Sequence, residues 1–345
     1  MNESRYRAYV YPNTSRDGGM INPYISHFMD SLTGKIEVVN RNSPSHSGIF
    51  DILKYMRKID ILFLNWPEEI PVKKGGFLQM LFFILVIYYL KHKNVRIFWT
   101  LHNKESHIQQ KAWIKNYVRN ITAKKSDYII THAREGISLI EKLSKPGRAR
   151  IKFFHHPVLP PIPLADPIQK KYDILIWGMV APYKGIDRFL KFIRNEQLQQ
   201  LKILIAGKIT DDSYRNEILS YQTDHIEILD AFITLEQLEK FIAQSRVVLF
   251  TYLENSILSS GALMDTLRYA PLIVGPNYGA FKDLYQEGLI YVYDNYAQLK
   301  TILADQDLQP DSWKIHKFIT DHSWSDFGTS VYNLVHSDKI PNNSL

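Results

Sequence analysis

The sequence of 345 residues contains no cysteine. This excludes disulfides, thiolate metal sites and a cysteine nucleophile, so any chemistry must use oxygen and nitrogen groups. The first residues, MNESRYRAYVYPNTS, lack the long apolar run of a signal peptide, which favours a protein that stays in the cytoplasm. The most apolar stretch, at 77–90, would form a helix of about 21 Å, too short for the roughly 30 Å hydrocarbon core of a bilayer.

The composition is that of an ordinary globular protein. Hydrophobic residues make up 45% of the chain and charged residues 22%, which is typical of a folded protein with a core of good size. At roughly 100 to 200 residues per domain, the length favours two domains.

Charge is distributed unevenly along the chain. Residues 1–156 hold 25 Lys and Arg against 12 Asp and Glu, a balance of +13, and the remainder holds 17 against 23, a balance of −6. The split indicates that the first half faces an anionic partner such as a membrane surface, a phosphorylated lipid or a nucleic acid. An uneven but merely solvated surface is the alternative.

Short apolar runs rich in β-branched and aromatic residues recur, each followed by a longer stretch with helical spacing. This alternation predicts an α/β fold, with parallel sheets covered by helices on both faces. The expected strands are RAYVYP ending at Pro12, then 35–40, 60–66, 95–103, 127–133 and 151–157, and in the second half 173–178, 202–207, 226–229, 246–252, 271–275 and 289–293.

The segment HPVLPPIPLADP separates the two halves. Its prolines forbid a regular helix and disfavour an interior strand, so it is the best candidate for a linker. Two α/β domains joined there would form a cleft, with ligands expected at the carboxyl ends of the strands. The prolines are Pro157, Pro160, Pro161, Pro163 and Pro167.

The apolar stretch at 77–90 has basic residues on both sides, at 73–74 and 91–93. One interpretation is a helix buried against the sheet. The other is an interfacial helix whose basic flanks meet anionic head groups.

The strongest functional motif is WGMVAPYKGIDRFLKFI, a strand that ends at Gly178, a loop, and a helix that opens near Gly185. A lysine at the mouth of such a loop reaches the phosphates of a ligand in the cleft, and Lys184 is the candidate for that contact. The alternative is a solvated lysine at a helix start.

A second motif is TYLENSILSSGALMDTLRYAPLIVGPNYG, in which a strand runs into a polar loop and then a helix that starts near Ser259. Free backbone N–H groups at a helix start bind anions, and Ser259, Ser260 and Gly261 let a phosphate approach closely. A serine pair before a helix is also a common N-cap.

These two segments, in this order and spacing, resemble the nucleotide-sugar half of a GT-B fold glycosyltransferase, close to the family 4 (group 1) enzymes. That family has G-R-x-x-x-x-K-G after the first strand of its second domain and E-x7-E before a P-V-I strand. The first half is similar to a bacterial polysaccharide-assembly branch in NPYI at 22–25, LNWPE at 64–68 and TLHN at 100–103. On the acceptor side, the resemblance points to Gly18 and Gly19 in a glycine loop and to Asn103.

The resemblance implies a GT-B architecture of two Rossmann-like domains that face each other across a cleft. We expect an N-terminal acceptor-side domain at 1–158 and a C-terminal nucleotide-sugar-binding domain at 168–312. Residues 313–345 look like the closing helices that cross back onto the first domain in GT-B proteins.

The implied activity is that of a hexosyltransferase-type enzyme. It would move a sugar from a UDP- or GDP-type donor to a glycan or lipid-linked saccharide acceptor in surface polysaccharide biosynthesis, on the inner face of the membrane. Lysine and helix N–H groups, instead of a metal, would stabilise the departing diphosphate. No other cofactor is implied, and the D-x-D at Asp305–Asp307 is predicted to be a surface loop.

The sequence departs from the family pattern at two places. Met179 and Ala181 stand where many relatives carry an arginine beside the diphosphate lysine, and Lys208 after the next strand is a candidate replacement. The E-x7-E pair is absent, since its second position falls on Met264. Glu254 remains a candidate to hold the donor sugar hydroxyls, against a plain loop carboxylate.

The acceptor hydroxyl must lose a proton, and several residues of the first half are candidates to take it. They are Asp17, Glu68 or Glu69, and His102. A histidine suits proton transfer near neutral pH. In retaining relatives, a histidine at a comparable place contacts the donor sugar instead, and local bonding to backbone is a third possibility for His102.

Two other function classes remain open. One is a GT-B nucleotide-sugar 2-epimerase, against which the apolar segment with basic flanks argues. The other is a non-catalytic protein that binds a nucleotide sugar or another anion. Nucleic acid is not an expected partner, because no recognised motif with interleaved aromatic residues is present.

Overall fold

All twelve expected strands are present in the structure, a computed structural model, and each overlaps the apolar run that predicts it. The structure describes residues 6–13, 23–104, 112–143, 150–163, 169–254 and 256–337. Within these ranges, none of the helices is both long enough and apolar enough to cross a bilayer.

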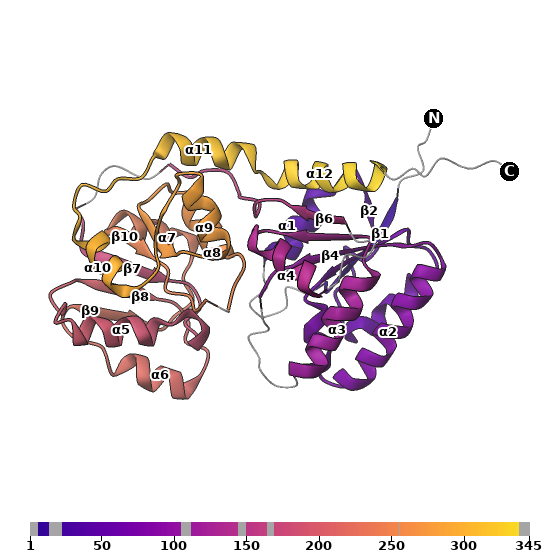
Figure 1. Cartoon of the computed structure of the whole chain (residues 1–345), viewed down its shortest axis with the longest axis horizontal. Coiled ribbons are helices and arrows are strands. Elements are labelled where there is room, and N and C mark those ends of the chain that lie inside the picture. The colour runs from indigo at the N-terminus through magenta and orange to yellow at the C-terminus, as the bar shows by residue number, and fades with distance from the viewer. Residues whose placement is uncertain are drawn as a thin grey trace. The chain divides into compact units, whose positions relative to one another are not determined.

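The chain divides into two units, each built on a six-stranded, wholly parallel sheet (Figure 1). Unit 1 comprises residues 1–157 and 322–345, and unit 2 comprises 158–321. The strand order is β2-β1-β3-β4-β5-β6 in unit 1 and β12-β11-β10-β7-β8-β9 in unit 2. The first strand of unit 2, β7, is therefore central, whereas that of unit 1, β1, lies beside the edge strand β2. The chain crosses over a face of the sheet at each step.

The strands of unit 1 are β1 (Arg7–Tyr11), β2 (Glu37–Val38), β3 (Ile61–Asn65), β4 (Arg96–Leu101), β5 (Tyr128–Thr131) and β6 (Arg150–Phe153). Those of unit 2 are β7 (Tyr172–Trp177), β8 (Ile203–Ala206), β9 (Ile226–Leu229), β10 (Ser245–Leu249), β11 (Ile273–Pro276) and β12 (Tyr291–Tyr293).

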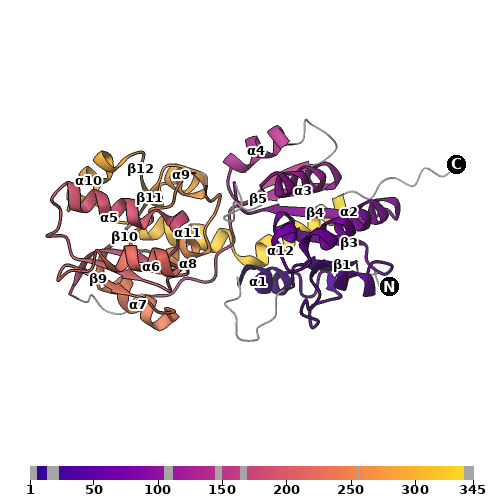
Figure 2. The same cartoon turned by 90° about the horizontal axis from the view of Figure 1, so that it is seen from below.

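The described α-helices of unit 1 are α1 (Pro23–Ser31), α2 (Gly76–His92), α3 (Ala112–Lys125), α4 (Glu135–Leu143) and α12 (Trp324–Ser337), with the 3₁₀ segments η1 (Gly48–Lys54) and η2 (Pro67–Val72). Alternate strand residues point to opposite faces. Phe63 and Phe98 pack with α1 and α12 on one face, and α2 and α3 contact β4 from the other (Figures 1 and 2).

Unit 2 has the same layering. Its described helical segments are η3 (Pro182–Lys184), α5 (Ile186–Asn195), α6 (Asp212–Leu219), α7 (Leu235–Ala243), α8 (Gly261–Leu267), α9 (Gly279–Gln286), α10 (Tyr296–Ala304) and α11 (Ser312–Asp321). Leu175 and Leu204 face α7, α8, α9 and α11, whereas Ile174 and Ile203 face α5, α6 and α10. The alternation assigns each strand side chain to one of two cores.

The helices that the sequence groups at 313–345 are divided between the units. Ile315 and Phe318 of α11 pack into the core of unit 2, and α12 belongs to unit 1. Residues 158–163 of the proline-rich segment also belong to unit 2, where Ile162 N–H donates to the carbonyl oxygen of Arg268 at 2.8 Å.

Helix α12 lies very close to α1, because Gly328 has no side chain. A Cβ atom built on Gly328 would lie 2.2 Å from the carbonyl oxygen of Ser31. Phe327 and Val331, on either side of this contact in sequence, are buried in the core of unit 1. The glycine therefore sets the distance at which the last helix packs.

Replacement of Gly328 by alanine is expected to destabilise unit 1 by about 1–3 kcal/mol, because the added methyl group overpacks a backbone contact. Chemical denaturation followed by circular dichroism measures the change. The control is Thr329→Ala at the next, exposed position of α12, which is expected to change stability by less than about 0.5 kcal/mol. An unchanged midpoint for Gly328→Ala would show that the contact between α12 and α1 accommodates a methyl group without cost.

Candidate functional site

In unit 2 the chain makes two tight turns after β7. Gly178 and Gly185 adopt left-handed φ values of 87° and 65°, which favour glycine. Gly207, just after β8, lies so close to this turn that a Cβ there would be 1.8 Å from the carbonyl oxygen of Gly178. The loops that leave β7 and β8 are therefore packed against each other at the carboxyl edge of the sheet.

Lys184 lies at the end of η3, and its ammonium group is turned back toward the sheet. Its Nζ donates to the carbonyl oxygen of Trp177 at 3.1 Å and lies 5.4 Å from the ring centre of Tyr252. The side chain is buried. Burial lowers the pKa of Lys184 to about 7, so the buried group is close to losing its charge at neutral pH.

The backbone of η3 is fixed by the segment that follows β10. Thr251 Oγ1 donates to the carbonyl oxygen of Lys184 at 2.7 Å, and Leu253 N–H donates to that of Tyr183 at 3.0 Å. The position of the Lys184 side chain therefore depends on two loops of the sheet edge.

The serine motif forms the N-terminus of α8. Ser260 is the N-cap, its Oγ accepts from the N–H of Leu263 at 3.3 Å, and it lies 2.9 Å from the hydroxyl of Tyr252. Among the described residues, the buried Oγ of Ser259 has no hydrogen-bond partner. Gly261 is exposed, and a Cβ there would meet nothing within 4 Å. The helix begins at Gly261, two residues later than the sequence predicts.

Tyr252 and Gly178 bring the two motifs together. Tyr252 contacts both Lys184 Nζ and Ser260 Oγ. A Cβ on Gly178 would lie 3.0 Å from Lys184 Nζ and 3.7 Å from Cβ of Ala262, in the first turn of α8. Two segments about 75 residues apart in the sequence thus meet at one edge of unit 2. The sequence reasoning did not single out Tyr252, because only the fold shows that it lies between them.

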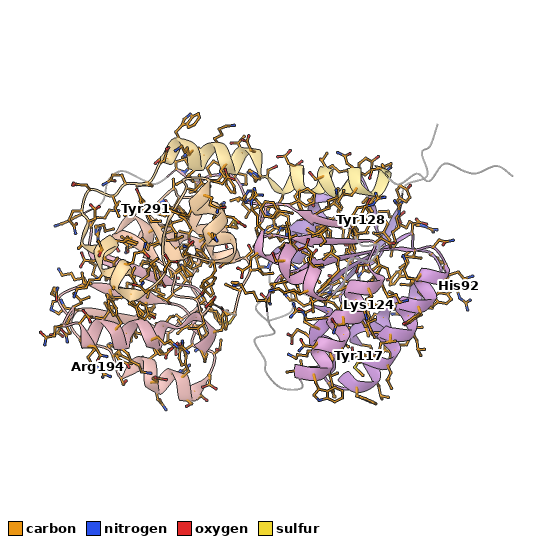
Figure 3. The ribbon with its side chains drawn as sticks, in the orientation of Figure 1. His92, Tyr117, Lys124, Tyr128, Arg194 and Tyr291 are labelled. Atoms are coloured by element: carbon orange, nitrogen blue, oxygen red, sulfur yellow. The ribbon has the colours of Figure 1, made fainter. Side chains whose placement is uncertain are left out.

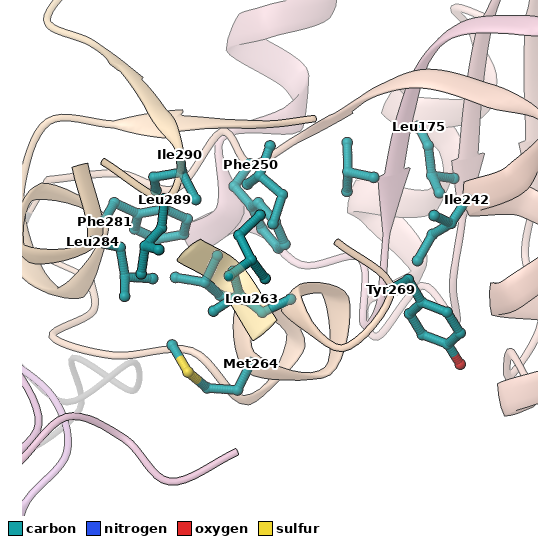
Figure 4. Close-up of a cluster of buried hydrophobic side chains, with 14 of the residues drawn as sticks. Leu175, Ile242, Phe250, Leu263, Met264, Tyr269, Phe281, Leu284, Leu289 and Ile290 are labelled. Carbon is teal, nitrogen blue, oxygen red and sulfur yellow. The ribbon is translucent and has the colours of Figure 1, made fainter. Parts of the chain in front are cut away.

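Packing of α8 against the sheet holds this arrangement in place. Leu263 and Met264 are buried in the core with Phe250 and Phe281 (Figure 4). Met264 stands where the second glutamate of E-x7-E falls, so this position faces the core. The neighbouring Asp265 is half-buried, and burial raises its pKa to about 6.

Two further residues that the sequence predicts to contact the nucleotide-sugar donor are Lys208 and Glu254. Lys208 Nζ is 3.2 Å from Asp230 Oδ1, and Arg215 pairs with the other oxygen of the same carboxylate at 2.8 Å. Lys208 would have to leave Asp230 to contact a diphosphate. Glu254 is exposed in the turn after β10.

In unit 1, His102 follows β4 and is buried. Its Nε2 lies 2.9 Å from Asn65 Oδ1, and Asn65 Nδ2 donates to the carbonyl oxygen of Tyr11. Because Asn65 Nδ2 donates to Tyr11, the atom of Asn65 that faces His102 is Oδ1, which can only accept. His102 Nε2 therefore carries the proton, and Nδ1 has the lone pair. Burial, with His132 and His156 nearby, holds the pKa of His102 well below its usual value. Asn103, beside it, is half-buried.

His102 belongs to a cluster of aromatic and histidine side chains around Tyr24. Its ring stacks on Trp66 at 4.1 Å and meets the edge of Tyr24 at 4.6 Å. His132 Nδ1 donates to the carbonyl oxygen of Phe154, so its Nε2 accepts from the Tyr24 hydroxyl at 2.7 Å. The sequence reasoning missed this cluster. Its signal was the histidine that follows each of three neighbouring strands, in TLH, ITH and FHH.

The two carboxylates after β3 differ. Glu69 pairs with Lys115 at 3.1 Å. Glu68 is buried, and among the described residues its Oε2 has no hydrogen-bond partner. Burial raises the pKa of Glu68 to about 7, although Arg119 and Lys115 favour its charged form.

The remaining predicted residues are placed as follows. Asp17, Gly18 and Gly19 lie outside the described residues. Asp305 and Asp307 are exposed at the end of α10. Over the ranges that the structure describes, no group of three or more His, Asp or Glu side chains has an arrangement that could hold a metal ion.

No protein-family model matches the chain. The chain is similar to a curated protein, the GDP-mannose:glycolipid 4-beta-D-mannosyltransferase of Xanthomonas campestris pv. campestris. The two are 22% identical over 314 residues, which cover 84% of this chain and 80% of the relative.

Two solved structures have a similar fold. Sucrose-phosphate synthase from Thermosynechococcus elongatus matches with a TM-score of 0.69 and 13% identity, over 96% of this chain and 98% of that one. Anabaena Alr3699/HepE in complex with UDP matches with a TM-score of 0.66 and 9% identity, over 96% and 100%. The curated relative supports the predicted glycosyltransferase and does not favour the epimerase. The structures confirm the fold class expected from the sequence: the chain has the GT-B fold, with two Rossmann-like units.

Proposed function

We propose that this protein is a glycosyltransferase that moves a hexosyl group from a nucleoside-diphosphate sugar to a lipid-linked saccharide. The observation that carries this proposal is the buried Lys184 at the carboxyl edge of unit 2, close to the start of α8. The similarity to a GDP-mannose:glycolipid mannosyltransferase supports a GDP-type donor and a glycolipid acceptor. A UDP-type donor is the alternative.

The reaction breaks the bond between the anomeric carbon and the diphosphate oxygen, and it forms a bond from that carbon to the acceptor oxygen. Negative charge grows on the departing diphosphate as the old bond breaks. A fixed positive group lowers the barrier most where it is shielded from water, and Lys184 is shielded in this way. Ser259, Ser260 and Gly261 provide hydroxyl groups and open space beside it.

The acceptor hydroxyl loses its proton as the new bond forms. His102 is the candidate for this step because Nδ1 has the lone pair and Asn65 fixes the ring, although burial lowers its pKa and makes it a weak base. Asp17 remains a second candidate, and Glu254 remains a candidate to hold the donor sugar.

We expect no metal requirement, because Lys184 would supply the positive charge. Activity that survives EDTA would support this expectation.

We also propose that the protein works on an anionic membrane surface, where a lipid-linked acceptor resides. The apolar helix α2, with Lys73 and Lys74 before it and basic residues in its last turn, supports a contact through residues 73–93.

The first test is a thermal-shift screen against GDP, UDP, ADP, CMP and dTDP without added metal. A ligand that binds only the native state raises the melting temperature. The expected result is a shift with GDP, followed by release of GDP from GDP-mannose when a lipid-linked saccharide is added. No shift with any nucleotide, with or without magnesium, contradicts the proposal. Epimerised nucleotide sugar formed without an acceptor would identify an epimerase instead.

Replacement of Lys184 by methionine is expected to lower kcat/KM by roughly 10²- to 10³-fold, because a single preorganised charge is lost from the leaving group. Lys282→Met, an exposed lysine on α9, is the matched control and is expected to retain full activity. Both variants should keep the wild-type circular dichroism spectrum. Wild-type turnover in Lys184→Met would remove the lysine from the mechanism.

Nucleotide binding is expected to depend on pH through Lys184. The free lysine has a pKa of about 7, and a bound diphosphate favours its charged form and raises that pKa. Binding above pH 7 therefore takes up a proton, and affinity falls by up to about tenfold per pH unit as pH rises. Calorimetry of GDP binding in buffers of different ionisation enthalpy measures the uptake. Lys184→Met should abolish it, and uptake that persists in this variant would assign the proton to another group.

Replacement of His102 by alanine is expected to lower kcat by about 10²- to 10⁴-fold through loss of the proton acceptor. Binding of GDP should be unchanged, since unit 2 holds the nucleotide. The control is His316→Ala, on the exposed face of α11. A rise in KM for the donor without a change in kcat would indicate a sugar-binding role instead.

A further inference from the structure

Helix α2 exposes an apolar stripe along its length. Phe77, Leu78, Leu81, Leu85 and Tyr88 are between 44% and 69% exposed. Their spacing of three or four residues places them on one side of the helix. The opposite side, with Phe83 and Leu90, is buried. A stripe of this length on a surface helix is typical of an interaction site.

Helix α3 lies beside α2 and adds a second row to this surface (Figures 1 and 2). Trp113 is 77% exposed, and Tyr117, one turn further along, is 51% exposed. Lys125 Nζ, near the end of α3, lies 4.1 Å from the ring centre of Tyr88 on α2. This contact joins the two helices at the end of the apolar stripe.

The surface of both helices carries charge of a single sign. Neither α2 nor α3 contains an acidic residue. Lys74 before α2, Lys93 after it and Lys124 on α3 are exposed (Figure 3 labels Lys124). Cationic side chains thus lie around the apolar stripe, where an anionic partner would meet them.

We infer that α2 and α3 together form one membrane-binding face, which we call the α2–α3 face: Phe77, Leu78, Leu81, Leu85, Tyr88, Trp113 and Tyr117 with the surrounding lysines. The leucines of α2 enter the boundary between head groups and acyl chains. Trp113 and Tyr117 lie at the depth of the head groups, which aromatic side chains with a polar atom favour. The lysines contact anionic head groups.

The charge of the face favours a lipid surface over a second copy of the chain. Two such faces in contact would bring lysines together without a carboxylate from α2 or α3 to balance them. A bilayer containing anionic lipids satisfies both the apolar stripe and the lysines. The inference rests on the proposed function in one respect, because a lipid-linked acceptor would require the enzyme to work at a membrane.

Trp113 provides a direct test with vesicles of phosphatidylcholine, either pure or containing about one third phosphatidylglycerol. The difference in emission between wild type and Trp113→Phe isolates this residue. With the anionic vesicles we expect a blue shift and quenching by brominated acyl chains. Trp313 on α11 is 71% exposed and serves as the matched control. The difference in emission between wild type and Trp313→Phe should not change when vesicles are added.

A second pair of variants tests the stripe itself. Leu85→Glu, in the middle of the α2–α3 face, should lower vesicle binding by about tenfold or more through loss of apolar contact and charge repulsion. Leu235→Glu changes a comparably exposed leucine on α7 of unit 2 and should leave binding unchanged. High salt should weaken wild-type binding, because it screens the lysines.

Absence of vesicle binding overturns the inference, as does binding that leaves Trp113 emission unchanged or resists Leu85→Glu. A dimer in solution that Leu85→Glu dissociates would also overturn it. Activity on a water-soluble acceptor analogue separates this result from failure of the proposed function. If the transferase is active but does not bind vesicles, the inference and the proposed membrane contact fail, and the proposed transfer reaction stands. If the protein binds vesicles as expected but uses no nucleotide sugar, the proposed function fails.

Discussion

The burial of one ammonium group is the constraint on which the edge of unit 2 depends. A lysine is seldom buried without a carboxylate, because loss of water disfavours its charge. Lys184 is held there by the close packing of Gly178 and Gly207 and by bonds to its backbone from the segment after β10. Within the part of the chain that the structure describes, no carboxylate pairs with Lys184, and a bound diphosphate would supply that negative charge. The same packing that makes the charge costly in the free protein would therefore strengthen its attraction to a phosphate group.

The carboxyl edge of the sheet in unit 1 carries neutral histidine side chains. Each of the strands β4, β5 and β6 is followed by histidine, and their order in the sheet makes those histidines neighbours. Burial keeps their rings neutral: the pKa of His132 falls to about 3 and that of His156 to about 4. The fixed tautomer of His102 defines the nitrogen that would take a proton, although burial makes that nitrogen a weak base.

The strands were predictable because each of the twelve short runs rich in β-branched and aromatic residues is itself a strand, and recognising such runs needs no long-range information. That Lys184 and Ser260 lie at the same edge of unit 2 was predictable only through resemblance to a family. Tyr252, which lies between them, was not, because its role depends on how η3 packs beside α8. His132 was missed for the same reason. It lies 30 residues after His102, and only the order of strands in the sheet brings the two together.

The limits of periodicity are clearest at α2. Its sequence is apolar on all sides, so no pattern within it distinguishes the buried side from the exposed one. The sheet and the neighbouring helices decide this, and they leave Leu81 and Leu85 in solvent while Phe83 is covered. Trp113 was overlooked because α3 by itself is an ordinary surface helix. Only its position beside α2 makes Trp113 part of one surface, which apolar and basic side chains from two separate segments form.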